Sequence, residues 1–258
     1  MTAYHRVMHR RLTTLAAATL VTLASVAGAT GAASVEPAPL PLAGITIAID
    51  PGHDGGNASH PTAIHRRVFV GNGWKACNTV GTSTRGGYAE HRFTFAVAKR
   101  VRARLEALGA TVFLTRSSDT GVGPCVDVRG RFGAKVHAAV LVSIHADGSS
   151  TSHHGFVVMR PGLVRGYTDD ILASSLTLAK AVRGGLRGVG LSVANYYGTN
   201  GLKTRTDLGT LNMSDVPAVM VELGNMKNSA DAHRMKTTSG RARYAAGLVA
   251  GIRAYLGH

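Results

Sequence analysis

Short runs of apolar residues alternate along the chain with segments in which apolar residues recur every three or four positions. The runs predict buried β-strands, and the recurring pattern predicts amphipathic helices. We expect strands over residues 45–50, 111–115, 138–144, 155–159 and 218–221, and helices over residues 90–108, 126–136, 169–187 and 241–256. This alternation is typical of an α/β fold. We therefore predict a single domain with a twisted, mostly parallel or mixed central sheet flanked by helices.

Two glycine-containing features interrupt this alternation. Residues 57–87 are rich in Gly, Asn, Ser and Thr and predict a long surface excursion. Within it, the runs 68–70 and 74–76 flank Asn72-Gly73, a dipeptide that favours a β-hairpin turn. Further along, Gly184-Gly185 falls inside a predicted helix and is expected to weaken it, because glycine is a poor helix former.

Residues 1–33 have the composition of a secretory signal. A basic start with three arginines is followed by an apolar stretch over residues 12–26 and by the small residues Ala27-Gly28-Ala29, which offer a cleavage site. A membrane anchor is the alternative, but the apolar stretch is shorter than the roughly 20 residues that a membrane-spanning helix needs. The Pro-rich residues 34–42 predict a linker, and we expect the folded domain to occupy residues 43–258.

The chain has two cysteines, Cys77 and Cys125. An exported protein folds in an oxidising environment, where an even number of cysteines favours disulfide formation. We therefore expect a disulfide between them, with two free thiols as the alternative. Because Cys77 belongs to the excursion, the bond would hold the excursion against the body of the domain.

The charge balance is strongly basic, with 29 Lys and Arg against 14 Asp and Glu residues and a formal net charge of +15. Without the three arginines of the predicted signal, 26 basic and 14 acidic residues leave a net charge of +12. Such a charge favours polyanionic surroundings. Since the sequence has no nucleic-acid-binding motif and predicts export, anionic cell-wall polymers fit better than nucleic acid. A solvated basic surface without a specific partner is the alternative.

Four polar residues are candidates for chemistry. His53, His145 and Glu222 each stand where a predicted strand ends, and ligand sites in open α/β sheets form beyond such ends. Glu90 lies three positions before Phe93 on the apolar face of its helix, where a carboxylate needs a pairing partner or a metal. Two imidazoles and one carboxylate can bind a catalytic zinc ion and leave a position for water. Glu222 would then be a free carboxylate for proton transfer.

Each candidate also has an interpretation without a metal. His53 could be a turn residue after Pro51-Gly52, and His145 could be an ordinary strand-end histidine. Glu90 could be an acid favoured by the dipole of its helix, and Glu222 could accept hydrogen bonds from the following loop. Spacing alone leaves both interpretations open.

Six short motifs occur in a fixed order over nearly all of the predicted domain. They are Ile49-Asp50-Pro51-Gly52-His53, Glu90 at a helix start, Leu114-Thr115-Arg116-Ser117-Ser118-Asp119, Arg129, Val142-Ser143-Ile144-His145-Ala146-Asp147, and Pro217-Ala218-Val219-Met220-Val221-Glu222-Leu223-Gly224. This series resembles the zinc-dependent N-acetylmuramoyl-L-alanine amidases of bacterial cell-wall turnover, the amidase type 3 family. The excursion with Trp74 and Cys77 resembles a disulfide-bearing, actinobacterial-type branch, here in a single-domain form.

The resemblance implies that His53, Glu90 and His145 bind zinc at the carboxyl ends of the strands and that Glu222 is the catalytic carboxylate. It also implies hydrolysis of the amide bond between N-acetylmuramic acid and L-alanine in peptidoglycan or muropeptides. Two positions depart from the family's pattern. Asn225 replaces the phenylalanine of the usual Gly-Phe pair, and Asn212 stands where an arginine is common.

The basic residues Arg85, Lys203 and Arg205 are candidates for contacts with carboxylates of the peptide stem, and a solvated surface role is the alternative. We expect an exported monomer that is secreted, periplasmic or cell-wall associated and not stably inserted in a membrane after signal cleavage. A zinc peptidase that cuts the stem peptide elsewhere and a non-catalytic cell-wall-binding module are the competing hypotheses.

Overall fold

The computed structural model describes residues 38–258, so the predicted signal and residues 34–37 of the predicted linker lie outside the described residues. The folded unit spans Pro39–His258. Leu42 is fully buried in the core, and its N–H donates to the carbonyl of Leu108. The last residues of the predicted linker therefore pack against the domain. None of the helices in this part of the chain combines the length and the apolar character that crossing a membrane requires.

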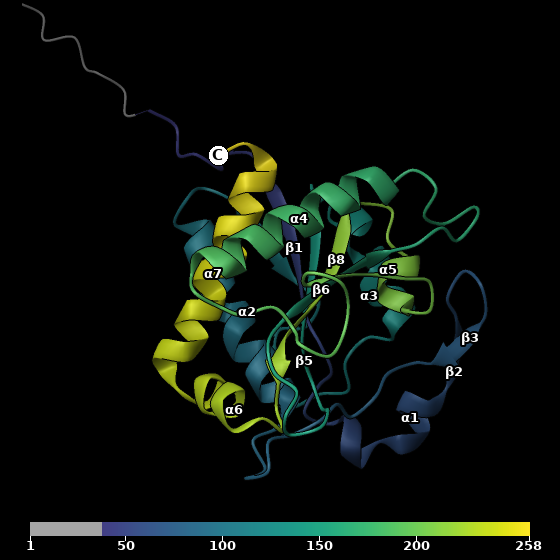
Figure 1. The fold of residues 1–258 in the computed structure, drawn as a ribbon. Helices are drawn as coiled ribbons and strands as arrows, with labels where there is room; N and C mark the ends of the chain where they lie inside the picture. Colours follow the sequence, from purple (N-terminus) through teal and green to yellow (C-terminus); the bar gives the residue numbers. More distant parts are fainter. Residues whose placement is uncertain (1–37) are drawn as a thin grey trace, which may run out of the picture. The chain divides into compact units, whose positions relative to one another are not determined.

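A six-stranded sheet runs through the domain in the order β4-β1-β5-β8-β6-β7 (Figure 1). Strands β4, β1, β5 and β8 are parallel, whereas β6 is antiparallel to β8 and β7 is parallel to β6. The sheet is therefore mixed, and the predicted α/β class is confirmed. The strands are β1 (Thr46–Pro51), β4 (Thr111–Leu114), β5 (Leu141–Asp147), β6 (Val157–Pro161), β7 (Leu202–Arg205) and β8 (Ala218–Asn225).

Helices cover both faces of this sheet (Figure 1). One face packs against α2 (Glu90–Glu106), α4 (Leu172–Gly188) and α7 (Thr238–Leu256), with α6 (Ser229–Lys236) beside α7. The other face packs against α3 (Val126–Lys135) and the short α5 (Gly209–Asn212). Alternation along each strand supplies both cores, because Ile47 and Ile49 enter the larger one and Ala48 the smaller one.

The predicted excursion folds into short elements of its own. They are the 3-10 turn η1 (Asn57–Ser59), the helix α1 (Pro61–His65) and an antiparallel hairpin of β2 (Arg67–Phe69) and β3 (Trp74–Ala76). The hairpin turns at the predicted Asn72-Gly73, and the predicted disulfide joins Cys77, next to β3, to Cys125 at the start of α3. Both predictions are confirmed, and the disulfide fixes the end of the excursion to the body.

Two strands extend further than the sequence pattern predicts. We expected His145 and Glu222 beyond their strands, but β5 continues to Asp147 and β8 to Asn225. The extension arises because the two parallel neighbours keep pairing, with His145 opposite Glu222. Strand β7 was not predicted, since its sequence Leu-Lys-Thr-Arg has no apolar run.

The glycine pair does not interrupt α4, which continues through it to Gly188. A Cβ at Gly185 would lie 2.3 Å from the carbonyl oxygen of Gly247 and 2.5 Å from the nitrogen of Gly251 in α7. A Cβ at Gly184 would meet no atom within 4 Å. Gly185 therefore allows the backbones of α4 and α7 to approach closely, whereas Gly184 has no such role.

We predict opposite effects of alanine at these two neighbouring positions. Gly184→Ala should stabilise the domain by about 0.5–1 kcal/mol, because alanine is the better helix former. Gly185→Ala should destabilise it by about 1–3 kcal/mol, because the methyl group forces α4 and α7 apart. Urea unfolding followed by circular dichroism measures both free energies. Equal stabilisation by the two variants would contradict the close packing of α4 on α7.

Candidate metal centre and substrate groove

His53 follows β1 in a backbone conformation that is uncommon for a residue with a side chain. Its φ is +60°, and its carbonyl oxygen accepts a hydrogen bond from Arg129 Nη2 at 2.9 Å. The ring is buried, and Nδ1 lies 3.0 Å from the carbonyl oxygen of Thr79. Since a carbonyl only accepts, Nδ1 carries the proton, and Nε2 keeps its lone pair for a ligand.

Arg129 and Asp50 form a fully buried ion pair under this segment. The guanidinium of Arg129 also donates to the carbonyls of Pro51 and Pro124, at 2.9 and 2.8 Å. Asp50 accepts a further hydrogen bond from Ser143 Oγ at 2.6 Å. Burial alone would raise the pKa of Asp50, but Arg129 and the hydroxyl donors outweigh it and lower the pKa to about 2.

Glu90, the first residue of α2, is the centre of the cluster. Its Oε1 lies 3.0 Å from His53 Nε2 and 3.0 Å from His145 Nδ1. Backbone N–H groups orient the carboxylate, because Ala146 donates to Oε1 at 3.0 Å and Thr82 donates to Oε2 at 2.9 Å. The predicted position of Glu90 on the apolar face is confirmed by its exposure of only 4%. Although burial raises its pKa, the two histidines have the larger combined effect and lower it.

His145 packs its ring directly on the backbone of Gly52. A Cβ at Gly52 would lie 2.2–2.6 Å from three atoms of the His145 ring, so only glycine fits there. The ring of His145 meets that of His53 edge to face, with centroids 4.8 Å apart. Gly52, the residue before His53 in the first motif, is therefore required by a side chain from another strand.

The three side chains fit a single divalent cation. One ligand atom from each of His53, Glu90 and His145 can be chosen so that all lie within 4.8 Å of one another. Ligand atoms of a tetrahedral zinc ion are about 3.3 Å apart, given zinc–nitrogen and zinc–oxygen bonds of about 2.0–2.1 Å. Glu90 Oε1 lies 3.0 Å from a ring nitrogen of each histidine, close to this separation, so the three residues fit a zinc ion.

Glu222 lies opposite His145 on the neighbouring strand β8. Its Oε2 is buried and has no hydrogen-bond partner within the described chain. Burial, together with the charges of Glu90 and Asp147, raises the pKa of Glu222 well above its ordinary value, against an opposing effect of Arg205. A carboxylate with a buried, unpaired oxygen is costly for folding, and such groups are characteristic of sites that exchange protons.

These residues share an open groove of about 630 Å³. The segment Asn78–Thr82 and the hairpin residues Lys75 and Ala76 line one part of it, and residues Asp207–Thr210 line another. The metal-ligand candidates His53, Glu90 and His145 and the carboxylate of Glu222 also line it. The groove therefore gives a substrate access to all four predicted site residues.

The three basic residues predicted to contact substrate do not line this groove. Lys203 and Arg205 lie on β7 beside Tyr197, with Lys203 Nζ 5.3 Å from the centre of that ring. Arg205 binds Asp207 through two hydrogen bonds of 2.6 Å. Arg85 lines a different hollow. The sequence analysis missed Lys75 and Asp207, because neither belongs to a motif.

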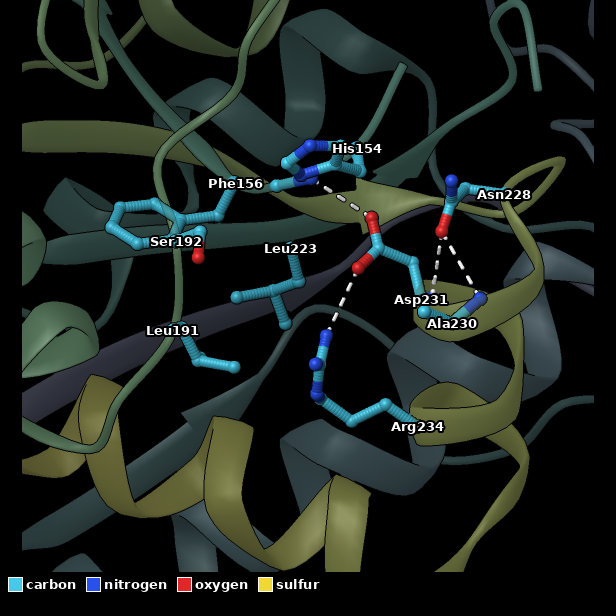
Figure 2. A pocket seen from close by; sticks show the side chains of 10 residues that line it. His154, Phe156, Leu191, Ser192, Leu223, Asn228, Ala230, Asp231 and Arg234 are labelled. Carbon is cyan, nitrogen blue, oxygen red and sulfur yellow. Dashed lines mark hydrogen bonds and ion pairs between the residues drawn. The ribbon is translucent and has the colours of Figure 1, made fainter. Parts of the chain in front are cut away.

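A second, smaller cavity of about 250 Å³ is lined by Leu223 of β8, by Phe156 just before β6 and by Asp231 and Arg234 of α6 (Figure 2). It shares no lining residue with the groove. Figure 2 shows Asp231 at its wall between His154 and Arg234. The carboxylate accepts hydrogen bonds from the N–H groups of Gly155 and Asn225 and pairs with Arg234 at 2.9 Å. Asp231 thus ties β8 to the loop before β6, a structural role.

The mixed α/β sheet carries a His–Glu–His set and an unpaired carboxylate in one groove, an arrangement that zinc-dependent hydrolases use. A family model described as N-acetylmuramoyl-L-alanine amidase matches residues 47–254, and the chain belongs to this family. The family is generally zinc-dependent, and the amidases in it are hydrolases.

Named relatives are similar to this protein over most of its chain. The N-acetylmuramoyl-L-alanine amidase Rv3717 of Mycobacterium tuberculosis is 42% identical over 227 residues, which cover 86% of this chain and 91% of that protein. The crystal structure of the N-acetylmuramyl-L-alanine amidase Ami1 from Mycobacterium smegmatis superimposes with a TM-score of 0.79 at 39% identity, covering 84% of this chain and 98% of that one. The probable cell wall amidase LytH of Staphylococcus saprophyticus is 27% identical, covering 86% and 62%.

We predict that Arg129→Met destabilises the domain by about 3–5 kcal/mol, because it leaves the carboxylate of Asp50 buried without its partner. The matched control is Arg131→Met on the same helix. Arg131 is 50% exposed and pairs with Asp127 at 3.1 Å, so its loss should cost less than about 1 kcal/mol. Guanidinium chloride unfolding measures both. Similar costs for the two variants would show that the buried pair is not a main support of the fold.

The lowered pKa of Asp50 also predicts a pH dependence. Its carboxylate stabilises the fold fully above its ordinary pKa of 3.8, and this contribution disappears as the pH falls towards 2. The difference in unfolding free energy between the wild type and Asp50→Asn should therefore shrink by about 2 kcal/mol between pH 5 and pH 2. Unfolding curves at several pH values measure it. A difference that stays constant over this range would contradict the assignment.

Proposed function

We propose that this chain hydrolyses the amide bond between the lactyl group of N-acetylmuramic acid and L-alanine in peptidoglycan or muropeptides. The observation that supports this most directly is the meeting of His53, Glu90 and His145 beside the unpaired carboxylate of Glu222 in one open groove. Relatives that carry the amidase name cover most of the chain and agree with it.

His53, Glu90 and His145 would hold a zinc ion in this proposal. When bound, such an ion lowers the pKa of a water molecule towards neutrality and polarises a carbonyl group. The surrounding residues orient the ligands, because Thr79 fixes the tautomer of His53 and two backbone N–H groups hold Glu90. The site is therefore arranged before a ligand arrives.

Glu222 is the proposed general base and acid. Glu222 lines the groove opposite His145, and no protein donor binds its Oε2 within the described chain, so the carboxylate is free to accept the proton of an attacking water molecule. The same carboxyl group then returns this proton to the nitrogen of L-alanine as the carbon–nitrogen bond breaks. The products are N-acetylmuramic acid with a free carboxylate and a peptide with a new amino terminus.

The chain's composition and its relatives support a location for the reaction outside the cytoplasm, at the cell wall. The probable cell wall amidase LytH is named for the cell wall, and we propose an exported protein acting there. Residues 1–33 would be a cleaved secretory signal, residues 34–42 a linker and residues 43–258 the catalytic domain. A net charge of +12 without residues 1–33 would favour an anionic cell wall. We further propose that the domain acts as a monomer.

Purified protein incubated with muropeptides tests this function. Mass spectrometry should detect free N-acetylmuramic acid ends and stem peptides that begin with L-alanine. A chelator should abolish cleavage, and zinc should restore it. A cut elsewhere in the stem peptide would favour the competing peptidase hypothesis, and cleavage that survives metal removal would contradict the metal mechanism.

We predict that Glu222→Gln lowers kcat/KM by about 10²–10⁴-fold, the usual contribution of a general acid–base group. Zinc content measured by elemental analysis should stay at the wild-type level, because Glu222 is not a proposed ligand. Glu106→Gln, an equivalent change at an exposed position of α2 paired with Arg102, serves as control and should keep full activity. Activity of Glu222→Gln within a few-fold of wild type would exclude the proposed role.

A further inference from the structure

Lys75 places an ammonium group at the groove that contains the proposed zinc site. It lies on β3 opposite Val68, which is buried, whereas the neighbouring pair Phe69 and Trp74 is on the exposed face of the hairpin. Lys75 therefore lies on the face of the hairpin that is turned towards the domain and its groove. Arg129, the other basic residue that lines the groove, is already bound to Asp50.

Several interactions fix the hairpin that carries Lys75. The disulfide holds Cys77, two residues further along the chain. At the turn, Asn72 Nδ2 donates to the carbonyl of Thr206 at 2.6 Å. The buried Asn212 donates to the carbonyls of Val70 and Thr206, at 3.1 and 2.8 Å. These contacts fix the position of the Lys75 backbone relative to residues Asp207–Thr210, which line the other part of the groove. Asn212, which makes two of them, stands where an arginine is common in the family.

Asp207, which pairs with Lys75, leaves the positive charge of Lys75 largely available. Lys75 Nζ lies 3.7 Å from Asp207 Oδ2, and both side chains are about half exposed, so this contact is weak. Asp207 already accepts two hydrogen bonds of 2.6 Å from Arg205, one at each oxygen. The three side chains together carry two positive charges and one negative charge. Their net charge of +1 can attract an anion.

The proposed substrate carries its negative charges on one side of the scissile bond only. The carboxyl group of N-acetylmuramic acid is consumed in the amide bond, and the hydroxyl and N-acetyl groups of the sugars are neutral. The stem peptide, by contrast, has free carboxylates beyond L-alanine. An ammonium group in the groove therefore complements the peptide side of the substrate.

We infer that Lys75 is a specificity-determining residue that binds a carboxylate of the stem peptide, and that the hairpin β2–β3 forms the peptide side of the groove. This inference rests on the proposed amidase function. Lys75 Nζ donates hydrogen bonds to the substrate carboxylate, while Arg205 compensates the charge of Asp207, which would otherwise repel it.

Kinetics with matched substrates test the inference. The probes are a muramoyl tripeptide with free carboxylates, the same compound amidated at the second residue, the same compound amidated at the carboxyl terminus, and the fully amidated compound. Lys75→Met should lower kcat/KM for the free tripeptide roughly tenfold, mainly through KM, as expected for one lost charge-assisted hydrogen bond. It should leave kcat/KM for the fully amidated compound unchanged. The singly amidated compound on which the loss disappears identifies the carboxylate.

Three further variants separate this role from a structural one. Lys75→Arg should recover most of the activity, and Lys75→Glu should be worse than Lys75→Met on the free tripeptide alone. Lys180→Met removes the same charge at an exposed position of α4 and should change nothing. If Lys75→Met does not fold, wild-type kcat/KM for the free over the fully amidated tripeptide should exceed one and fall as salt is added.

Two results would overturn the inference. One is a loss of activity in Lys75→Met that is equal on the free and the fully amidated tripeptide, and the other is no loss on the free one. A wild-type protein that cleaves neither compound at the amide bond contradicts the proposed function instead, so the two failures are distinguishable.

Discussion

The guanidinium of Arg129 lies buried between the end of β1, the segment of His53 and the loop next to the disulfide, and the metal centre depends on it. It binds Asp50 and the carbonyls of three other residues, one of which is His53 itself. Since His53 has a left-handed backbone conformation, something must compensate its cost, and the hydrogen bond to its carbonyl does so. The buried ion pair of Arg129 with Asp50 therefore also helps to hold His53, a metal-ligand candidate, in place.

The rest of the centre is built by the sheet. Parallel pairing of β5 with β8 places His145 opposite Glu222, and pairing of β1 with β5 brings the segment of His53 beside them. Helix α2 then supplies Glu90 from one face, where both imidazoles approach the same carboxylate oxygen. Because strand ends and a helix start are rigid, the ligand candidates are positioned without a metal, and Glu222 keeps an unpaired oxygen beside them.

The groove has a different origin from the metal centre. Its peptide side, as we infer it, comes from the hairpin β2–β3, which the disulfide and Asn212 attach to the domain. Asn212 and Asn225 depart from the family's pattern, and both are fully buried and hydrogen-bonded. Asn225 holds the loop after β5 through the carbonyls of Ser150 and His153. These departures therefore shape the surroundings of the site and leave the metal-ligand set unchanged.

The sequence by itself determined most strands and helices, the hairpin, the disulfide and the four central polar residues, because periodicity, turn dipeptides and motif order are properties of the linear chain. It missed β7, whose residues have no apolar pattern, and it did not reveal that Gly185 allows the close approach of α7, a helix about sixty residues further along the chain. Only the tertiary structure decided that Lys75 lines the groove and that Arg85, Lys203 and Arg205 do not. Which side chains share a surface depends on strand register and helix packing between distant segments, and no local pattern encodes that.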